Sequence, residues 1–255
     1  MTDTAPTSDH YLGLAGARPM PTAATLTTQR LLDTATKHHA MVCIHGDVGL
    51  GKTFAVRVNL RDHEPEGVLW LEFRRGAGVP ALCDALFRAL KVDGDPPSRP
   101  RDYDSLLLEA LAARPYLMVC DEAQGLAVNA LEYLRQLWNN DRTQIGIAFI
   151  GGENTKQRIN SRPALSSRIL SWQQYQPLTT EEVETIIPNY HPLWKDLPPE
   201  DLHWVDAAIC HGNFRNWAKV TFHLQEVLES PRAPDRVDRD LVRSILSDLD
   251  TTYRS

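Results

Sequence analysis

No apolar run in the sequence approaches the roughly 20 residues needed to cross a bilayer. The N-terminal segment MTDTAPTSDHYLGLAG also lacks the basic and apolar regions of a signal peptide. Internal repeats and low-complexity tracts are missing as well. From these absences we expect a cytoplasmic protein without membrane contact.

Cysteine is scarce, and its spacing argues against the common metal motifs. None of the four cysteines (Cys43, Cys83, Cys120 and Cys210) takes part in a C-x-x-C pair. Two of them lie inside apolar, strand-like runs, where cysteine behaves as a small buried hydrophobic residue. We therefore interpret them as structural thiols rather than metal ligands or disulfide partners.

An excess of positive charge is also lacking. The chain has 27 Lys and Arg residues against 33 Asp and Glu residues, so its formal net charge is −6. This balance argues against a protein that coats nucleic acid with its whole surface, and it leaves room for a local basic patch.

The composition is that of an ordinary globular protein. Of the 255 residues, 42% are hydrophobic and 24% are charged. A chain of this length fits one large domain or two small ones and can bury a substantial core.

Short apolar runs alternate with amphipathic segments over much of the chain. We expect strands over 41–46, 67–73, 115–123 and 143–152, and helices over 25–39, 52–64, 79–92, 103–114 and 129–140. Apolar strands that alternate with helices are typical of a parallel sheet covered on both faces. The expected fold class is therefore α/β.

The pattern changes after the segment PLTTEEV. Residues 197–230 and 238–253 have helical periodicity and no clear strand. We predict three parts: a flexible N-terminal arm over 1–24, an α/β domain over 25–177, and a small helical domain with a C-terminal helix over 178–255.

The segment GDVGLGKT matches the phosphate-loop pattern G-x-x-x-x-G-K-[ST] between an apolar strand and a helix. Backbone N–H groups of such a loop can surround a phosphate, and the helix N-terminus adds a favourable potential. Lys52 can reach the β- and γ-phosphate oxygens, and the Thr53 hydroxyl can bind Mg²⁺. The predicted ATP-binding residues are Gly46, Asp47, Val48, Gly49, Leu50, Gly51, Lys52, Thr53 and Phe54.

Two carboxylates follow the apolar run YLMVC. An isolated acidic pair after a strand is usually a solvated loop or a helix cap, but a phosphate loop in the same chain gives it a function. We predict that Asp121 holds the Mg²⁺ shell and that Glu122 orients and deprotonates the attacking water.

Two arginines complete a recognisable order. Arg168 lies in RPALSSRIL after the fourth expected strand, and Arg215 lies in HGNFRNW in the helical domain. The order of phosphate loop, Asp-Glu pair and arginines resembles the AAA+ ATPases over about residues 25–230. The resemblance implies a P-loop AAA+ domain followed by a small helical lid, and Mg²⁺-dependent ATP hydrolysis that is slow until DNA or oligomerisation stimulates it.

The same resemblance implies roles for individual residues. Arg168 is the arginine finger that one subunit supplies to its neighbour's nucleotide, with Arg162 as the alternative. Arg215 is the second sensor, which reports the γ-phosphate to the lid, and Asn154 in GGENT is the candidate first sensor. A finger supplied in trans implies self-assembly into a hexameric ring or a helical filament.

Within the AAA+ ATPases, the sequence is most similar to the transposition regulators of the phage Mu B, TnsC and TniB group. The compact size, the DEAQ tetrapeptide and the segments FIGGENTKQRI and SSRI carry this similarity. It implies ATP-dependent assembly on duplex DNA and recruitment of a transposase or integrase. Candidate contacts to DNA phosphates are Arg74, Arg75, Arg99 and Arg101.

Two classes of function remain open at this stage. One is a DNA-assembling ATPase that regulates a transposase or integrase. The other is a nucleotide-switched signalling ATPase, or a secretion ATPase related to ExeA, that acts on proteins without DNA.

Overall fold

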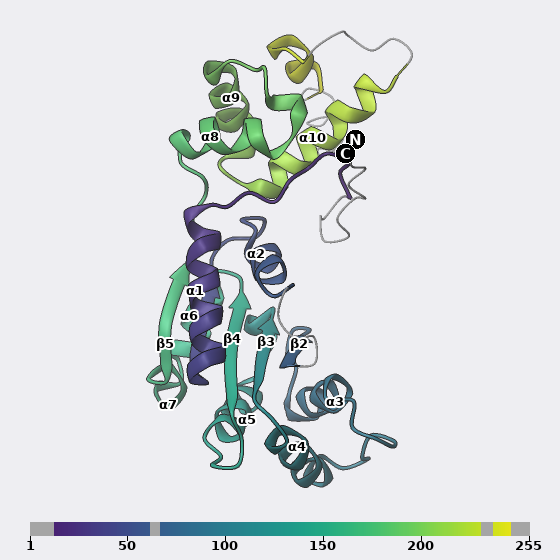
Figure 1. The fold of residues 1–255 in the computed structure, drawn as a ribbon, viewed down its shortest axis with the longest axis vertical. Coiled ribbons are helices and arrows are strands. Elements are labelled where there is room, and N and C mark those ends of the chain that lie inside the picture. The colour runs from purple at the N-terminus through teal and green to yellow at the C-terminus, as the bar shows by residue number, and fades with distance from the viewer. Residues whose placement is uncertain (1–12, 62–66, 231–236, 246–255) are drawn as a thin grey trace. The chain divides into compact units, whose positions relative to one another are not determined.

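The structure is a computed structural model that describes residues 13–61, 67–230 and 237–245 in two compact units (Figure 1). The sheet unit comprises Ala23–Val48 and Ala55–Tyr175. The helical unit comprises Gly49–Phe54 together with the described residues of Met1–Thr22 and Gln176–Ser255. The division therefore falls inside the glycine-rich loop.

The sheet unit is built on five strands in the order β2-β3-β4-β1-β5, and each neighbouring pair is parallel. The strands are β1 (Met41–His45), β2 (Val68–Glu72), β3 (Tyr116–Asp121), β4 (Ile145–Gly151) and β5 (Ile169–Gln174). The α/β class with a parallel sheet is thus confirmed.

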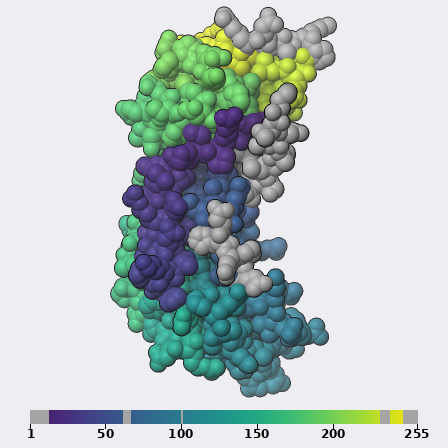
Figure 2. Space-filling view, in the orientation of Figure 1, coloured from purple at the N-terminus to yellow at the C-terminus, as the bar shows by residue number. Residues whose placement is uncertain are grey.

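Helices cover both faces of this sheet. Helix α1 (Ala23–His38) crosses the face turned to the viewer, where it contacts β1, β3, β4 and β5 (Figures 1 and 2). The core of the other face joins alternate strand residues such as Met118 and Phe149 to apolar residues of the remaining helices. These helices are α3 (Val79–Ala89), α4 (Tyr103–Ala112), α5 (Val128–Trp138), α6 (Asn154–Asn160) and α7 (Pro163–Ser166).

The sequence prediction of four strands was incomplete, because it missed the fifth strand, β5. Its sequence, ILSWQQ, lacks a continuous apolar run because β5 lies at an edge of the sheet and is only partly covered. Leu170 is 60% exposed, whereas the buried Gln173 is satisfied by a hydrogen bond of 2.8 Å from its Nε2 to the Ala24 carbonyl oxygen on α1. Polar and exposed positions at an edge strand conceal the strand from a hydrophobicity pattern.

The helical unit contains α8 (Thr180–Tyr190), α9 (Pro199–Val205), a π-helical segment (Asp206–Cys210) and α10 (Phe214–Leu228), and residues 239–245 are also helical. Trp194 and Trp217 are fully buried in its core, with ring centroids 5.0 Å apart. Each indole N–H donates a hydrogen bond, to Thr221 and Asp206 respectively. These tryptophans are therefore core residues of the helical unit.

Several segments of the sequence prediction lie outside the described residues. They are residues 1–12 of the expected arm, residues 62–64 of the second expected helix, and residues 246–253 of the C-terminal helix. Helix α2 is described over Lys52–Asn59. Among the described helices, none is long and apolar enough to cross a membrane.

All four cysteines are buried and free. Burial raises the pKa of the Cys43 and Cys120 thiols, which lie in the central strands β1 and β3. Thiols held in this protonated state pack as apolar side chains.

Candidate nucleotide-binding site

The carboxyl ends of β1, β3 and β4 lie at the same edge of the sheet because the strands are parallel (Figure 1). The glycine-rich loop begins at Gly46, directly after β1, and Asp121 is the last residue of β3. Strand β4 separates them, so they are two strand spacings, or about 10 Å, apart. This edge is where ligands bind in parallel α/β sheets.

The first part of the loop is shaped by close contact with the end of β5. Gly46 has φ 142°, and an added Cβ would come closer than 3.0 Å to the Tyr175 carbonyl oxygen. The Tyr175 N–H donates a 2.7 Å hydrogen bond to the His45 carbonyl oxygen. Only a residue without a side chain fits at this turn.

The second part of the loop lies against the start of α10 within the helical unit. Gly49 has φ 87°, and an added Cβ would overlap the Asn213 side chain. The Arg215 N–H donates to the Gly49 carbonyl oxygen at 3.1 Å. The structure thus places the Arg215 backbone beside the loop, and the sensor role of this residue stays a prediction.

The turn before α10 explains how Arg215 reaches this position. The π-helical segment ends at His211, which has a left-handed backbone (φ 49°), and Gly212 follows with φ 68°. The Asp206 carboxylate accepts the Gly212 N–H at 2.8 Å, and the Asn213 side chain caps α10 by accepting the Arg215 N–H at 3.0 Å.

Lys52 and Thr53 are the first two residues of α2, at the helix N-terminus. Lys52 is buried, with 8% of its surface exposed. A lysine at a helix N-terminus favours an anion, because its charge adds to the positive end of the helix dipole. The loop residues therefore fit a phosphate-bearing ligand.

Asp121 is buried, and its carboxylate accepts the Glu122 N–H at 3.0 Å. Glu122 is exposed and has a left-handed backbone, with φ 53° and ψ 40°. Its position after a buried strand presents the carboxylate at the carboxyl edge of the sheet. A strained non-glycine residue at such an edge is typical of functional sites.

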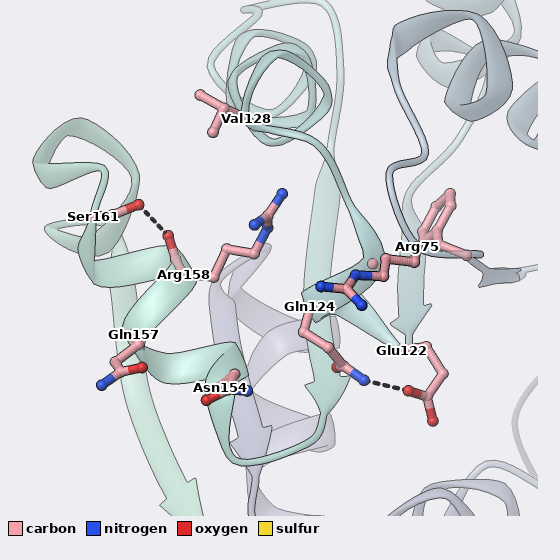
Figure 3. Close-up of a pocket in the computed structure, with 10 residues that line it drawn as sticks. Arg75, Glu122, Gln124, Val128, Asn154, Gln157, Arg158 and Ser161 are labelled. Carbon is pink, nitrogen blue, oxygen red and sulfur yellow. Dashed lines mark hydrogen bonds between the residues drawn. The ribbon is translucent and has the colours of Figure 1, made fainter.

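A cavity of about 660 Å³ opens beside Glu122 in the sheet unit (Figure 3). Asn154, the candidate first sensor, is the first residue of α6 and lines this cavity together with Glu122. The other lining residues are Phe73, Arg75, Gln124, Gly125, Val128, Gln157, Arg158 and Ser161. The structure therefore brings Asn154 into the neighbourhood of Glu122.

The two candidate arginine fingers differ in their surroundings. Arg168 donates hydrogen bonds to the Asn139 side chain at 3.1 Å and to the Ala164 carbonyl oxygen at 2.5 Å. The Arg162 Nε is buried and has no hydrogen-bond partner within residues 13–61, 67–230 and 237–245. Both residues flank α7.

The predicted DNA-contacting arginines fall into two separate groups. Arg74 and Arg75 are exposed on the loop after β2, which is held by hydrogen bonds from Gly76 and Ala77 N–H to the Gly125 carbonyl oxygen. Arg99 and Arg101 precede α4, whose first residue, Tyr103, contacts Phe87 near the end of α3. Helix α3, which is about 16 Å long, therefore separates the two groups.

Gln124 is a site residue that the sequence analysis did not assign. Its side chain donates a hydrogen bond to the Glu122 carboxylate (Figure 3). It also accepts the Gly152 N–H at 3.0 Å. The signal was present in the DEAQ tetrapeptide, where the polar residue stands two positions after Glu122.

The residues present also fit magnesium. Across the described part of the chain, no group of three or more His, Cys, Asp and Glu side chains could hold a metal ion. Mg²⁺ usually binds through one or two carboxylates, water and substrate phosphates rather than in a protein cage. Asp121, buried at the end of β3, is a carboxylate of this kind, and Thr53 stays the second predicted ligand.

Comparison with known proteins identifies the fold. Residues 34–159 match the family model described as AAA domain. No curated protein sequence matches the chain. The parallel sheet, the phosphate loop and the C-terminal helical region together form the P-loop fold of the AAA+ ATPases, which confirms the expected fold class.

Three solved structures illustrate this likeness. Cdc6p from Pyrobaculum aerophilum has a TM-score of 0.67 and 15% identity, over 83% of this chain and 63% of its own. The Aeropyrum pernix ORC2 protein, solved as ADPNP-ADP complexes, has a TM-score of 0.62 and 16% identity, over 88% of this chain and 66% of its own. The Aeropyrum pernix ORC1 protein, solved in complex with DNA, has a TM-score of 0.65 and 19% identity, over 92% of this chain and 66% of its own. The chain thus spans just under two thirds of these relatives, and the likeness concerns the fold.

The contact between Gly49 and Asn213 leads to a testable difference between two loop glycines. Gly49 (φ 87°) and Gly51 (φ 90°) share the same backbone strain for alanine, but a Cβ at Gly51 would meet Phe214 only at 3.9 Å. We expect Gly51→Ala to lower the unfolding free energy by about 1–2 kcal/mol, and Gly49→Ala to lower it further. Chemical denaturation of the nucleotide-free proteins measures both values; equal losses would contradict the contact.

Proposed function

We propose that this protein is an AAA+ ATPase that assembles on duplex DNA when it binds ATP, and that regulates or recruits a transposase or integrase. One observation carries the ATPase part: a glycine-rich phosphate loop and a carboxylate pair leave neighbouring parts of the same sheet edge, at the ends of β1 and β3. The AAA-domain match over residues 34–159 supports the same conclusion.

Each predicted site residue has a defined task in the proposed reaction. Lys52 binds phosphate oxygens of the substrate ATP, and the loop N–H groups bind the remaining phosphate charge. Thr53 and Asp121 would hold Mg²⁺, which when bound neutralises the phosphate charge. Glu122 accepts a proton from the attacking water. Arg215, at the start of α10, senses whether the γ-phosphate is present.

Two observations support DNA as the polymer on which the protein assembles. The Aeropyrum pernix ORC1 protein, which shares this fold, was solved in complex with DNA. In this chain, Arg74 and Arg75 are exposed on a loop held against Gly125, three residues after Glu122. Because the net charge is −6, affinity for a polyanion must come from such local groups arranged in an oligomer.

The assignment to transposition is supported by sequence similarity alone. The DEAQ tetrapeptide and the segments FIGGENTKQRI and SSRI are most similar to the transposition regulators. A DDE transposase encoded by the adjacent gene would strengthen this assignment. The ring or filament that we propose is a self-assembly in which one subunit's arginine completes the neighbouring active site.

Substitutions of Lys52 and Glu122 separate ATP binding from hydrolysis. Lys52→Ala should weaken ATP binding about 10- to 100-fold, because it removes a charge-assisted contact to phosphate. Glu122→Gln should bind ATP normally and lower turnover by about 10²- to 10⁴-fold, because it removes a general base. Calorimetry with ATP and a phosphate-release assay measure the two effects.

Arg57→Ala is the matched control for the loss of charge at Lys52. Arg57 is exposed near the other end of α2 and lies over the Trp70 ring, at 4.8 Å from its centroid. Its removal should leave ATP affinity unchanged. Hydrolysis by Glu122→Gln at the wild-type rate would remove Glu122 from the role of base.

A further prediction concerns the arginine finger. Arg168→Ala should bind ATP but hydrolyse it at least about tenfold more slowly, because a finger stabilises charge in the transition state. Mixing Arg168→Ala with Lys52→Ala protein should restore part of the activity, since an intact loop and an intact arginine meet wherever a Lys52→Ala subunit supplies its arginine to an Arg168→Ala subunit. The mixing experiment is run in parallel with Arg162→Ala.

The mixing experiment distinguishes the two candidate fingers by which variant regains activity. Restoration with Arg168→Ala and none with Arg162→Ala assigns the finger to Arg168. The reverse result assigns it to Arg162. No restoration with either variant, while oligomers form normally, would contradict a finger supplied in trans.

The DNA prediction uses salt dependence. Replacing Arg74 and Arg75 with alanine should weaken duplex binding about equally for all sequences, because phosphate contacts carry no base information. Each lost contact should lower the slope of log affinity against log salt by about 0.9. Fluorescence anisotropy of labelled duplex DNA in ATP, in ADP and without nucleotide measures this slope.

A double variant at the opposite edge of the sheet is the charge-matched control. Arg114 and Arg142 precede β3 and β4, so Arg114→Ala with Arg142→Ala removes the same charge far from the proposed contact. This control should keep the wild-type slope. If the wild-type protein shows no ATP-stimulated DNA binding even at low salt, the DNA proposal fails and the signalling or secretion function replaces it.

A further inference from the structure

The Gln124 side chain connects Glu122 to the loop between β4 and α6. Its Oε1 accepts hydrogen bonds from the Gly152 N–H and from the Thr155 hydroxyl, both at 3.0 Å. Because this oxygen faces two donors, the amide orientation is determined, and Nε2 is directed to the Glu122 carboxylate. One side chain thus contacts three chemical groups, which belong to Glu122 after β3, to Gly152 after β4 and to Thr155 in α6.

Gly151 leaves the space that the Gln124 oxygen occupies. A Cβ added to Gly151 would come closer than 3.0 Å to both the Gln124 Oε1 and the Thr155 hydroxyl oxygen. A Cβ added to the adjacent Gly152 would meet the Gln124 Nε2 only at 3.6 Å. Neither glycine has a positive φ, so the difference between them is one of space and not of backbone conformation.

The backbone of Glu122 is already fixed by its neighbours. The Asp121 carboxylate accepts the Glu122 N–H at 3.0 Å, and the Glu122 carbonyl oxygen accepts the Gly125 N–H at 2.7 Å. The remaining freedom lies in the side chain, which is exposed at the cavity (Figure 3). Within the described part of the chain, the hydrogen bond from Gln124 is what restricts that carboxylate.

We propose that Gln124 is a positioning residue for the Glu122 carboxylate, held in place by Gly152, Thr155 and the absence of a side chain at Gly151. This inference rests on the proposed function, in which Glu122 accepts a proton from the attacking water. Gln124 acts through the Glu122 carboxylate, to which its Nε2 donates a hydrogen bond. A misplaced carboxylate lowers the rate of hydrolysis, because proton transfer requires the base to lie within hydrogen-bond distance of the attacking water.

Replacing Gln124 with leucine keeps a similar volume and removes all three hydrogen bonds. We expect kcat to fall by about tenfold to 10²-fold, with an unchanged KM for ATP and unchanged ATP affinity. Thr155, which is fully buried, provides a conservative pair. Thr155→Val should lower kcat, whereas Thr155→Ser, which keeps the hydroxyl donor, should retain it.

The two adjacent glycines provide a test that changes no polar group. Gly151→Ala should lower kcat as Gln124→Leu does, because the new methyl group displaces the Gln124 amide. Gly152→Ala, which meets only an ordinary contact, should behave like the wild type. In a Gln124→Ala background, where the overlap with the amide is gone and only the overlap with the Thr155 hydroxyl remains, Gly151→Ala should cause a smaller further loss than it does in the wild type.

Three results would overturn the inference. They are wild-type kcat in Gln124→Leu, equal effects of Gly151→Ala and Gly152→Ala, or fully additive losses in the Gln124→Ala and Gly151→Ala double variant. Thermal unfolding and ATP binding of each variant distinguish a misplaced carboxylate from a protein that fails to fold. If the wild-type protein itself hydrolyses no ATP, the proposed function fails first and the positioning role falls with it.

Discussion

The parallel alignment of β1, β3 and β4 is the constraint on which the candidate site depends. Because the three strands run in the same direction, the chain leaves each of them at one edge of the sheet. The phosphate loop, the carboxylate pair and the segment that leads into α6 therefore begin side by side. An antiparallel β3 would send Asp121 and Glu122 to the opposite edge, away from Gly46.

The second feature that organises the site is close packing against glycine backbone. Gly46 lies against the Tyr175 backbone, Gly49 against the Asn213 side chain, and Gly151 against the Gln124 amide. In two of these contacts the neighbour is an amide side chain that also forms hydrogen bonds important for the site. The glycines in this chain therefore determine which polar side chains can reach the loops.

Sequence patterns predicted the parts of the site that lie in one continuous segment. The phosphate loop and the Asp121-Glu122 pair follow apolar strands and have recognisable spacing, so the sequence alone was enough to place both. The pattern missed β5, whose exposed Leu170 and buried Gln173 reverse the usual relation between polarity and burial. It also could not show that Gln124 reaches Gly152, because that hydrogen bond joins residues 28 positions apart.

The central claim is that the loop and the carboxylate pair together make a DNA-responsive ATPase. Phosphate release from ATP by the purified wild-type chain, with Mg²⁺ or with a chelator, and over a range of duplex DNA concentrations, tests this claim directly. We expect slow release that requires Mg²⁺ and rises with duplex DNA. No release above the protein-free rate at any DNA concentration would contradict it.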